Sequence, residues 1–281
     1  MQNTDIEDFI TRALKEDIGD GDHTSLACIS PAIKGKAHLL VKEDGILAGA
    51  KLAERIFKTV DKDISIRFLL KDGSHIKTGD TAFIVEGNAQ AILKTERLVL
   101  NCMQRMSGIA SYTNSLVKQL EGLNTKLLDT RKTTPGIRFL EKWAVKIGGG
   151  ENHRFGLYDM IMIKDNHIDY AGGIENAINA VKLYLHQNNK ELKIEIEARN
   201  LTELNEILSV GGVDRIMLDN FSIADLKTAV SLINRKYETE ASGGITDKNI
   251  RNYAATGVDF VSIGALTHNI KSLDLSLKAI K

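Results

Sequence analysis

Two spacings of apolar residues alternate along the first third of the chain. At 5–14 they recur every three to four residues, which predicts a short helix, and turn-forming residues at 17–24 end it. Helical spacing returns at 50–60. The remaining stretches alternate apolar and polar residues between Gly-centred turns, which predicts strands at 37–41, 65–70 and 81–86. Strands and helices mixed in this way predict a small α+β unit.

A longer helical segment follows this unit. Residues 91–120 keep helical spacing with few helix-breaking residues, so one or two long helices are predicted, ending near Gly122. We expect the chain to pass into a second domain at about this point.

The second half of the chain repeats one unit, in which a short apolar strand ends in a polar cluster and is followed by a helix. The predicted strands with their polar ends are 127–131, 160–165, 194–197, 216–219, 240–243 and 260–264. This order is typical of an α/β barrel, whose active site gathers at the carboxyl ends of its strands. We therefore expect the polar clusters to converge.

Composition narrows the class of partner. The chain has 281 residues, of which 43% are hydrophobic, enough for a sizeable core. Lys plus Arg equals Asp plus Glu at 37 each, so no overall field favours nucleic acid or an anionic membrane, and neither is expected as a partner. No apolar run approaches the roughly 20 residues needed to span a bilayer, and the first residues lack a signal pattern, so we expect a cytoplasmic protein. Cys28 and Cys102 form no CxxC pair and are expected to be packed free thiols.

Three kinds of chemical group stand at the predicted strand ends. They are the basic residues Arg131, Lys132 and Lys164, the carboxylates Glu197 and Asp219, and the glycine-rich turns Ser242-Gly243-Gly244 and Gly264-Ala265. Such a pocket suits a phosphorylated substrate that carries a metal ion, because the cations can bind a polyanion, the carboxylates can bind Mg²⁺ and backbone amides can bind phosphate. Glu195 shares a strand face with Glu197, and both a solvated face and an acid site are open there.

A glycine-rich loop adds two further candidates. Gly148, Gly149 and Gly150 precede His153 and Arg154 and allow close backbone approach. The planar fork of Arg matches a carboxylate, and a neighbouring His can add a hydrogen bond and, if protonated, a charge. The alternative is a flexible loop with exposed polar residues.

A long ordered set of motifs resembles the signature of the quinolinate phosphoribosyltransferases. It comprises DTRKTTPGIR at 129–138, GGGENHR at 148–154 and IKDNH at 163–167, joined by stretches at 16–22, 96–110, 195–197, 218–221, 241–245 and 263–268. The resemblance covers nearly the whole chain. One departure is Arg199, which follows Glu197 on the same strand face. It could modify the acidic corner, the pair of carboxylates Glu197 and Asp219.

The resemblance implies a fold and an assembly. We expect an α/β protein in which an N-terminal α/β sandwich domain, residues 1–110, precedes an incomplete α/β (TIM-like) barrel, residues 111–267, with 268–281 returning to the first domain. A neighbouring subunit would complete the site through Arg97. At least a homodimer is therefore expected, with a hexamer left open.

The resemblance also implies an activity and residue roles. The chain would transfer phosphoribosyl from phosphoribosyl pyrophosphate to quinolinate with decarboxylation, a step of NAD biosynthesis that uses Mg²⁺. Quinolinate would be bound by Arg97, Arg131, Lys132, His153 and Arg154. The ribosyl donor would be bound by Lys164, Glu197, Asp219, Ser242, Gly243, Gly244 and Gly264. Lys132, Lys164, Glu197 and Asp219 would be catalytic, and Glu197 and Asp219 would hold the metal.

Three other functions remain to be separated from this one. A related phosphoribosyltransferase-like protein linked to molybdenum uptake shares the expected fold, but is expected to lack part of the basic set that this chain retains. A Schiff-base lyase would use Lys132 or Lys164, although the flanking Asp129 and Asp165 disfavour the depressed lysine pKa that it needs. A non-catalytic nucleotide-binding protein could use the same residues.

Overall fold

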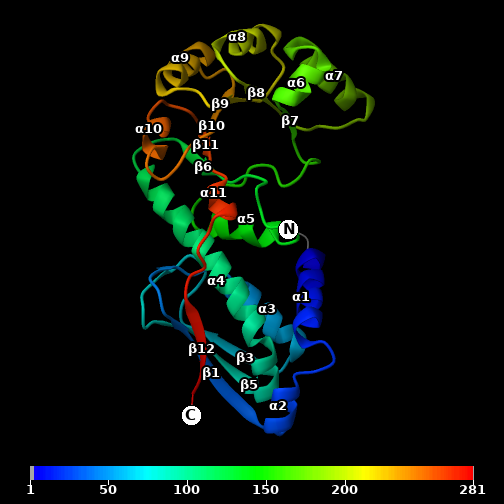
Figure 1. Ribbon diagram of the computed structural model, residues 1–281, viewed down its shortest axis with the longest axis vertical. Helices are drawn as coiled ribbons and strands as arrows, with labels where there is room; N and C mark the ends of the chain where they lie inside the picture. The colour runs from blue at the N-terminus through cyan, green and yellow to red at the C-terminus, as the bar shows by residue number, and fades with distance from the viewer. Residues whose placement is uncertain (1–2, 281) are drawn as a thin grey trace. The chain divides into compact units, whose positions relative to one another are not determined.

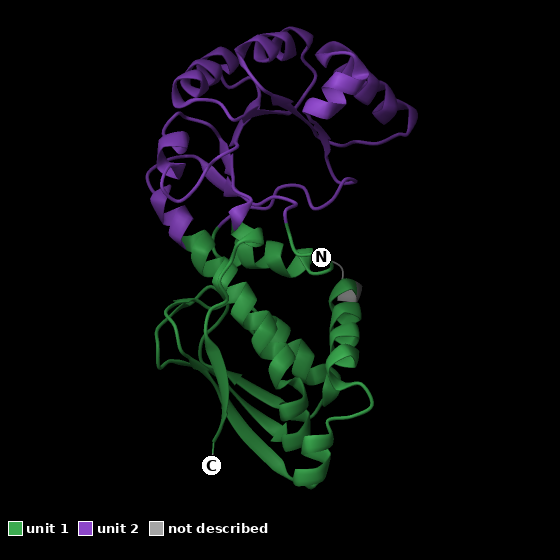
Figure 2. Ribbon diagram, in the orientation of Figure 1, with its two compact units in different colours: residues 1–114, 133–149, 266–281 green, residues 115–132, 150–265 purple. Residues whose placement is uncertain are grey.

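The chain folds into two compact units, each built from more than one stretch of sequence. The computed structural model describes residues 3–280, and side chains from residue 5 onward. Unit 1 takes in the chain up to residue 114, 133–149 and the part from 266 onward, and unit 2 takes in 115–132 and 150–265 (Figure 2).

Unit 1 places helices beside a four-stranded antiparallel sheet whose strand order is β12-β1-β5-β3 (Figure 1). Its elements are α1 (Asn3–Ile18), α2 (His23–Cys28), β1 (Lys34–Val41), β2 (Gly45–Ile46), α3 (Ala50–Val60), β3 (Ser65–Phe68), β4 (His75–Ile76), β5 (Thr81–Asn88), α5 (Arg138–Ile147) and β12 (Leu275–Ala279), with most of α4 (Ala89–Gln119) and of α11 (Ala265–His268). The predicted helix at 50–60 and the three predicted strands are present, and the helical spacing at 91–120 corresponds to one continuous helix.

The sheet and α3 share an apolar core. Strand β1 buries alternate residues, including Leu39 and Val41, so that one of its faces packs inside the unit. Phe57 of α3 meets Phe83 of β5 edge to face, with ring centroids 6.2 Å apart. The alternating and helical patterns of the sequence therefore point toward the same core.

The boundaries of the units differ from the predicted division at 110/111. Helix α4 runs through this position without a break, and residues 133–149 belong to unit 1 rather than to the barrel. A charged contact explains the second difference, because Arg105 of α4 donates from Nε to Glu141 of α5 over 2.7 Å. Gly148 lies so close to α4 that an added Cβ would stand 2.5 Å from the carbonyl oxygen of Ala110.

The last strand closes one edge of the sheet in unit 1. Strand β12 pairs antiparallel with β1, and Leu39 lies opposite Leu277. Leu275 and Leu277 are buried while Lys278 is exposed, so this strand contributes apolar side chains to the core.

Unit 2 is an open barrel of parallel strands with helices outside (Figures 1 and 2). Its six strands follow the order β6-β11-β10-β9-β8-β7 and are β6 (Lys126–Leu128), β7 (Ile161–Ile163), β8 (Ile194–Ala198), β9 (Arg215–Asp219), β10 (Glu238–Ser242) and β11 (Phe260–Ser262). The helices are α6 (Asp165–Ala171), α7 (Ile174–Gln187), α8 (Leu201–Val210), α9 (Ile223–Ile233) and α10 (Ile250–Ala254). Among the described residues β6 and β7 do not pair with each other, and beside β6 a single bridge joins Leu128 to Glu151. The predicted incomplete α/β barrel is thus present.

Two smaller expectations had different outcomes. Within the described residues, no helix combines the length and the apolar character that a membrane crossing requires. Cys102 is a buried free thiol, as predicted, but Cys28 is exposed at the end of α2, so its predicted packing is wrong. Burial raises the pKa of Cys102 to about 12.

The edge strand β12 should contribute measurably to stability. Leu275→Ala removes a buried side chain opposite Val41 and should lower the free energy of unfolding by about 2–4 kcal/mol, since truncation leaves a cavity. Lys278→Ala on the same strand is the control and should change it by less than about 0.5 kcal/mol. Urea unfolding followed by circular dichroism measures both, and equal effects would show that β12 does not pack as described.

Candidate active site

Every strand of the open barrel presents predicted site residues at its carboxyl end. Following the sheet order, these are Arg131 and Lys132 after β6, Gly264 after β11, Ser242, Gly243 and Gly244 at the end of β10, Asp219 on β9, Glu197 on β8 and Lys164 after β7. Because the strands are parallel, these ends meet at one side of the barrel, which is where barrel enzymes place their active sites. Arg97, the remaining predicted quinolinate ligand outside unit 2, lies on an exposed face of α4 in unit 1.

The acidic part of the site is formed by two neighbouring strands. Glu197 of β8 is buried and Asp219 of β9 is half-buried. Burial raises the pKa of Glu197, and the charge of Asp219 raises it further, so the two carboxylates share one region. The Nζ atom of Lys164 lies 4.0 Å from Glu197 Oε2 and opposes this shift.

Lys164 itself is held by the start of the next helix. It occupies the N-cap of α6, and its backbone N–H donates to Nδ1 of His167 over 2.9 Å. This contact fixes the backbone from which the lysine side chain extends toward Glu197. Lys164 therefore marks the border between the acidic and the basic side of the site.

Arg199 has little effect on the acidic corner formed by Glu197 and Asp219. Its guanidinium lies 3.2 Å from Asp169 of α6 and 2.7 Å from Glu203 of α8. Among the charges that act on Glu197, it lowers the pKa less than Lys164 does. The expected influence of Arg199 is therefore small, because its own partners lie on the flanking helices.

A clamped glycine turn lies next to the acidic corner. Gly243 and Gly244 have φ values of +90° and +63°, which L-residues rarely adopt. A Cβ added at Gly243 would stand 2.2 Å from Oδ1 of Asn220, so only glycine fits there. The backbone N–H of Asn220 donates to the carbonyl of Ser242 over 2.8 Å, which ties the ends of β9 and β10 together. Successive left-handed residues of this kind are typical of backbone concavities that bind anions.

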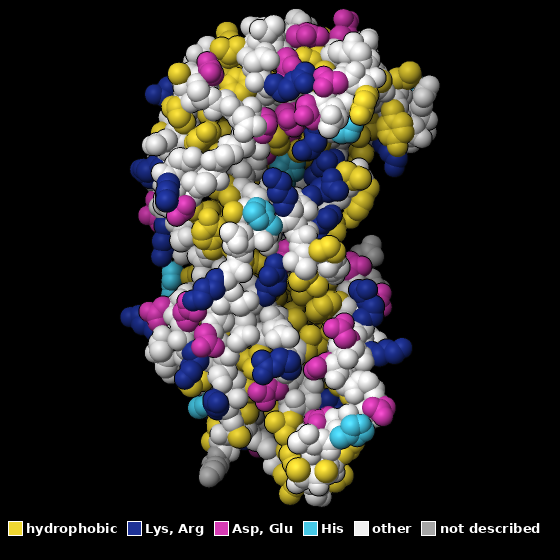
Figure 3. Space-filling view, viewed as in Figure 1, with side chains coloured by type: hydrophobic (Ala, Val, Ile, Leu, Met, Phe, Trp, Pro, Cys, Tyr) yellow, Lys and Arg dark blue, Asp and Glu magenta, His cyan; other side chains and the backbone are white. Residues whose placement is uncertain are grey.

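The basic part of the site is a pair of guanidinium groups. Arg154 is half-buried, and its pKa is lowered by burial and then by the nearby charge of Arg131. Its Nη1 donates to the carbonyl of Met160 over 3.1 Å. Two like charges held in one region favour binding of an anion between them. Figure 3 shows Lys and Arg side chains gathered beside carboxylates on the face of unit 2 turned toward the viewer.

His153 is buried, and both of its ring nitrogens contact protein groups. Nε2 lies 3.0 Å from Glu195 Oε2 and 3.2 Å from Glu240 Oε2. Nδ1 accepts the backbone N–H of Arg154 over 2.7 Å. The backbone N–H of His153 donates to Asp129, whose carboxylate also accepts from Asn152. The candidate loop is therefore fixed rather than flexible.

Together with the half-buried Arg215, whose Nη1 lies 3.3 Å from Glu240 Oε2, the buried residues His153, Glu195 and Glu240 form one cluster. Burial lowers the pKa of His153, but the two carboxylates outweigh it and raise the pKa to about 9. Burial and the charge of Glu240 raise the pKa of Glu195 to about 7. These raised pKa values indicate one proton beyond the one on Nε2, which could lie on Nδ1 of His153 or on one of the two carboxylates. Because Nδ1 accepts the N–H of Arg154, a carboxylate is the better place for this proton. The net charge of the cluster is the same in both cases.

The sequence analysis missed Glu240 and Arg215 and left Glu195 undecided. All three have inward-facing neighbours among the predicted site residues, since Glu195 stands two before Glu197, Glu240 two before Ser242 and Arg215 four before Asp219. Glu195 and Glu240 are fully buried, so the solvated face that was considered for Glu195 is wrong. The useful signal for the two glutamates was a charged residue on a predicted strand, two positions before a predicted site residue.

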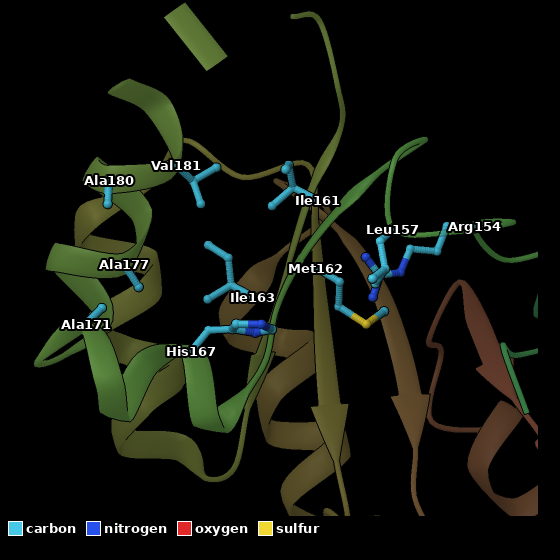
Figure 4. A pocket seen from close by; sticks show the side chains of 10 residues that line it. All are labelled: Arg154, Leu157, Ile161, Met162, Ile163, His167, Ala171, Ala177, Ala180 and Val181. Atoms are coloured by element: carbon cyan, nitrogen blue, oxygen red, sulfur yellow. The ribbon is translucent and has the colours of Figure 1, made fainter. Parts of the chain in front are cut away.

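An apolar cavity of about 370 Å³ borders Arg154. Figure 4 shows Ile161 and Ile163 of β7 facing the small side chains of α7, with Met162 on the side of Arg154 and Leu157. Met162 pairs with Glu195 in the sheet and so shares its inward face. Arg154 thus has Met162 and Leu157 as apolar neighbours, whereas Ile161 and Ile163 face α7 on the other side of β7.

Comparison with known proteins gives a consistent result. The chain matches the model of the quinolinate phosphoribosyl transferase N-terminal domain at residues 22–107 and that of the C-terminal domain at 109–278. It is 46% identical to an Arabidopsis thaliana protein named nicotinate-nucleotide pyrophosphorylase [carboxylating], chloroplastic, over 98% of this chain and 82% of that one. A nicotinate-nucleotide pyrophosphorylase structure from Francisella tularensis has a TM-score of 0.92 at 41% identity, covering 100% of this chain and 98% of that one. NadC from Streptococcus pyogenes has a TM-score of 0.93 at 37% identity, covering 100% and 99%. With both domain models matched, the two solved structures covered almost end to end and 82% of the Arabidopsis protein covered, the chain belongs to the quinolinate phosphoribosyltransferase family.

Proposed function

We propose that this chain transfers the phosphoribosyl group of phosphoribosyl pyrophosphate to quinolinate and releases pyrophosphate and carbon dioxide, which gives nicotinate mononucleotide for NAD biosynthesis. The observation that carries this proposal is the meeting of a guanidinium pair, an acidic corner and a glycine turn at one end of one barrel. These three parts match a dicarboxylate acceptor, a ribose with its metal, and a phosphate. Family membership supports the same reaction.

Quinolinate would lie on the basic side. Arg131 and Arg154 offer planar forks for its two carboxylates, and Lys132 adds a third cation next to Arg131. Met162 and Leu157, the apolar side chains on the side of Arg154, would pack against the pyridine ring. This arrangement would orient the ring nitrogen toward the acidic side, so that binding prepares the attack.

The ribosyl donor would lie on the acidic side. The Ser242-Gly243-Gly244 turn and Gly264, which follow adjacent strands, would hold the 5-phosphate. Glu197 and Asp219 would hold the ribose hydroxyls, and their negative charge would favour the cationic character that the ribose acquires during transfer. Lys164 and Lys132 would neutralise charge that develops on the departing pyrophosphate.

Magnesium fits the same acidic corner. Hard cations prefer carboxylate oxygens, and Glu197 and Asp219 offer two carboxylates in one region. Their mutual repulsion raises the pKa of Glu197, and a bound cation would relieve this repulsion. When bound there, Mg²⁺ would neutralise pyrophosphate oxygens.

Decarboxylation would follow transfer. Attack by the pyridine nitrogen forms the bond to the anomeric carbon while the bond to pyrophosphate breaks, which leaves a positive charge on the ring. Loss of carbon dioxide from the adjacent carbon leaves an electron pair there, which the ring charge stabilises until a proton is added. The ribosyl group is therefore needed before carbon dioxide can leave.

We further propose a homodimer in which Arg97 completes the partner's site, and we leave a hexamer open. Leu93 is 45% exposed one helical turn before Arg97, which gives α4 an exposed face with apolar and cationic character. The segment that carries the exposed Leu26 and Ile33 is bound to the start of α4 through Gln90 and Ala89. Such apolar surface is typical of an interface.

A cytoplasmic location is proposed as well, although relatives in plants are named chloroplastic or mitochondrial. The molybdenum-linked alternative has no observation in its favour, since the relatives reported above carry names of the pyridine nucleotide reaction or of NadC.

The purified protein should form nicotinate mononucleotide and carbon dioxide in equal amounts from quinolinate, phosphoribosyl pyrophosphate and Mg²⁺. Nicotinate should not replace quinolinate, since it lacks the second carboxylate. Carbon dioxide from labelled quinolinate should require the ribosyl donor, and excess chelator should stop both products. No turnover by folded protein would overturn the proposed function, and carbon dioxide release without the donor would overturn the order of the two steps.

Mixing two inactive variants tests the shared site. If Arg97 acts in the partner's site, Arg97→Ala and Lys164→Ala subunits that exchange freely should recover about a quarter of wild-type activity, because half the dimers are mixed and each has one intact site. The matched control is Lys164→Ala mixed with Glu197→Ala, which should recover nothing since both residues belong to unit 2 of one chain. Recovery in the control, or none in the test pair after proven exchange, would contradict the shared site.

A further inference from the structure

Two buried carboxylates, Glu195 and Glu240, lie one layer below the candidate active site, and the proposed function does not use them. Glu195 precedes Glu197 by two residues on β8, and Glu240 precedes Ser242 by two on β10, so each shares the inward face of a site residue. Both are fully buried. A buried carboxylate needs compensating partners, and the identity of those partners indicates what it does.

The two carboxylates converge on one atom. Nε2 of His153 lies 3.0 Å from Glu195 and 3.2 Å from Glu240. The ring can rotate only by leaving both of them, and neither strand can be shifted without moving the other strands of the sheet. His153 is thus oriented from its Nε2 side by the barrel interior.

The opposite side of the ring supports the site. Nδ1 of His153 accepts the backbone N–H of Arg154 over 2.7 Å, and the guanidinium of Arg154 donates to the carbonyl of Met160 over 3.1 Å. A continuous path of contacts therefore runs from the two strands through the imidazole to the arginine backbone. Both ring nitrogens therefore face protein groups, Nε2 the two carboxylates and Nδ1 the Arg154 amide.

Arg215 completes the cluster and disfavours a metal ion in it. Its Nη1 lies 3.3 Å from Glu240 and 3.9 Å from Glu195, and its guanidinium stacks over the ring of Phe260 with its central carbon 4.1 Å from the centroid. His153, Glu195 and Glu240 together could ligate a metal. The guanidinium already provides the positive charge that these carboxylates require, and a second cation beside it would be repelled.

We propose that Glu195 and Glu240 are positioning residues that act through His153 to hold Arg154 in place for the carboxylates of quinolinate. This inference rests on the proposed function. It reassigns His153 from direct binding of quinolinate to support of the arginine that binds it. Neither glutamate touches the substrate in this arrangement.

Amide variants replace one of the two carboxyl groups that face Nε2 of His153 with a carboxamide of nearly the same volume. Glu240→Gln or Glu195→Gln should raise the KM for quinolinate at least about tenfold, because Arg154 loses its fixed position, and should leave the KM for phosphoribosyl pyrophosphate within about twofold. The matched control is Glu238→Gln, since Glu238 lies 3.0 Å from Arg215 but is not one of the two carboxylates that face Nε2 of His153. It should leave both values unchanged.

Action through His153 predicts a loss that is not additive. His153→Asn should show the same rise in KM for quinolinate, and His153→Asn combined with Glu240→Gln should show little further rise. Multiplied effects in the double variant would overturn the proposal, as would equal rises in KM for both substrates, which indicate a general structural defect. Metal that copurifies with wild type and is lost from Glu240→Gln would overturn it too.

A crystal structure of Glu240→Gln separates this inference from the proposed function. The inference requires the His153 ring or the Arg154 backbone to move relative to wild type, whichever substrate the enzyme uses. Unchanged positions of both would overturn it even if quinolinate is the substrate. Absence of quinolinate turnover by wild type would instead overturn the proposed function, and the displacement in the variant would still decide the inference.

Discussion

The barrel interior must neutralise the charges that it buries, and the site above it depends on how this is achieved. Glu195 and Glu240 are removed from water inside unit 2, and His153 and Arg215 are the groups that compensate them. Removing one member would leave an uncompensated charge in a region of low dielectric. The cluster therefore fixes the relative positions of three strands and one loop.

The layer above this cluster uses the same inward faces for chemistry. In parallel strands with alternating side chains, residues two apart lie on one face, so each strand that buries a cluster residue presents a site residue closer to the open end. Glu197 follows Glu195 and Ser242 follows Glu240 in this way. The order of the strands then sets the order of charges, with the acidic pair on β8 and β9 and the basic residues after β6 and β7. An anionic ligand can thus bind on the basic side while a cationic group binds on the acidic side.

The local sequence pattern predicted most of the helices and strands, but it could not predict which of them contact each other. The helix at 50–60 and the six strands of the barrel follow from periodicity, because both depend on neighbours close in sequence. The assignment of 133–149 to unit 1 depends on Arg105 and Glu141, which are 36 residues apart, and no local pattern records such a pair. The same holds for His153, whose contacts with Glu195 of β8 and Glu240 of β10 could not be inferred from the sequence of its loop. The sequence thus indicated which residues gather at the strand ends. That Glu195 and Glu240 are buried below them became visible only in the folded structure.

The charges of the buried cluster are not needed for the stability of the barrel. An apolar layer of equal volume would be at least as stable, since desolvation of an ion pair often exceeds the attraction within it. Barrel interiors are usually filled by branched apolar side chains, but the inward face that Glu195, Arg215 and Glu240 share is mostly polar, with Met162, Met217 and Phe260 among its few apolar residues. Glu195 and Glu240 lie directly below residues that face the substrates, and their contacts lead through His153 to the backbone of Arg154 rather than to solvent. A layer that orients a cation needs directional contacts, which apolar packing cannot provide, so orientation of the site is the physical property that these charges supply.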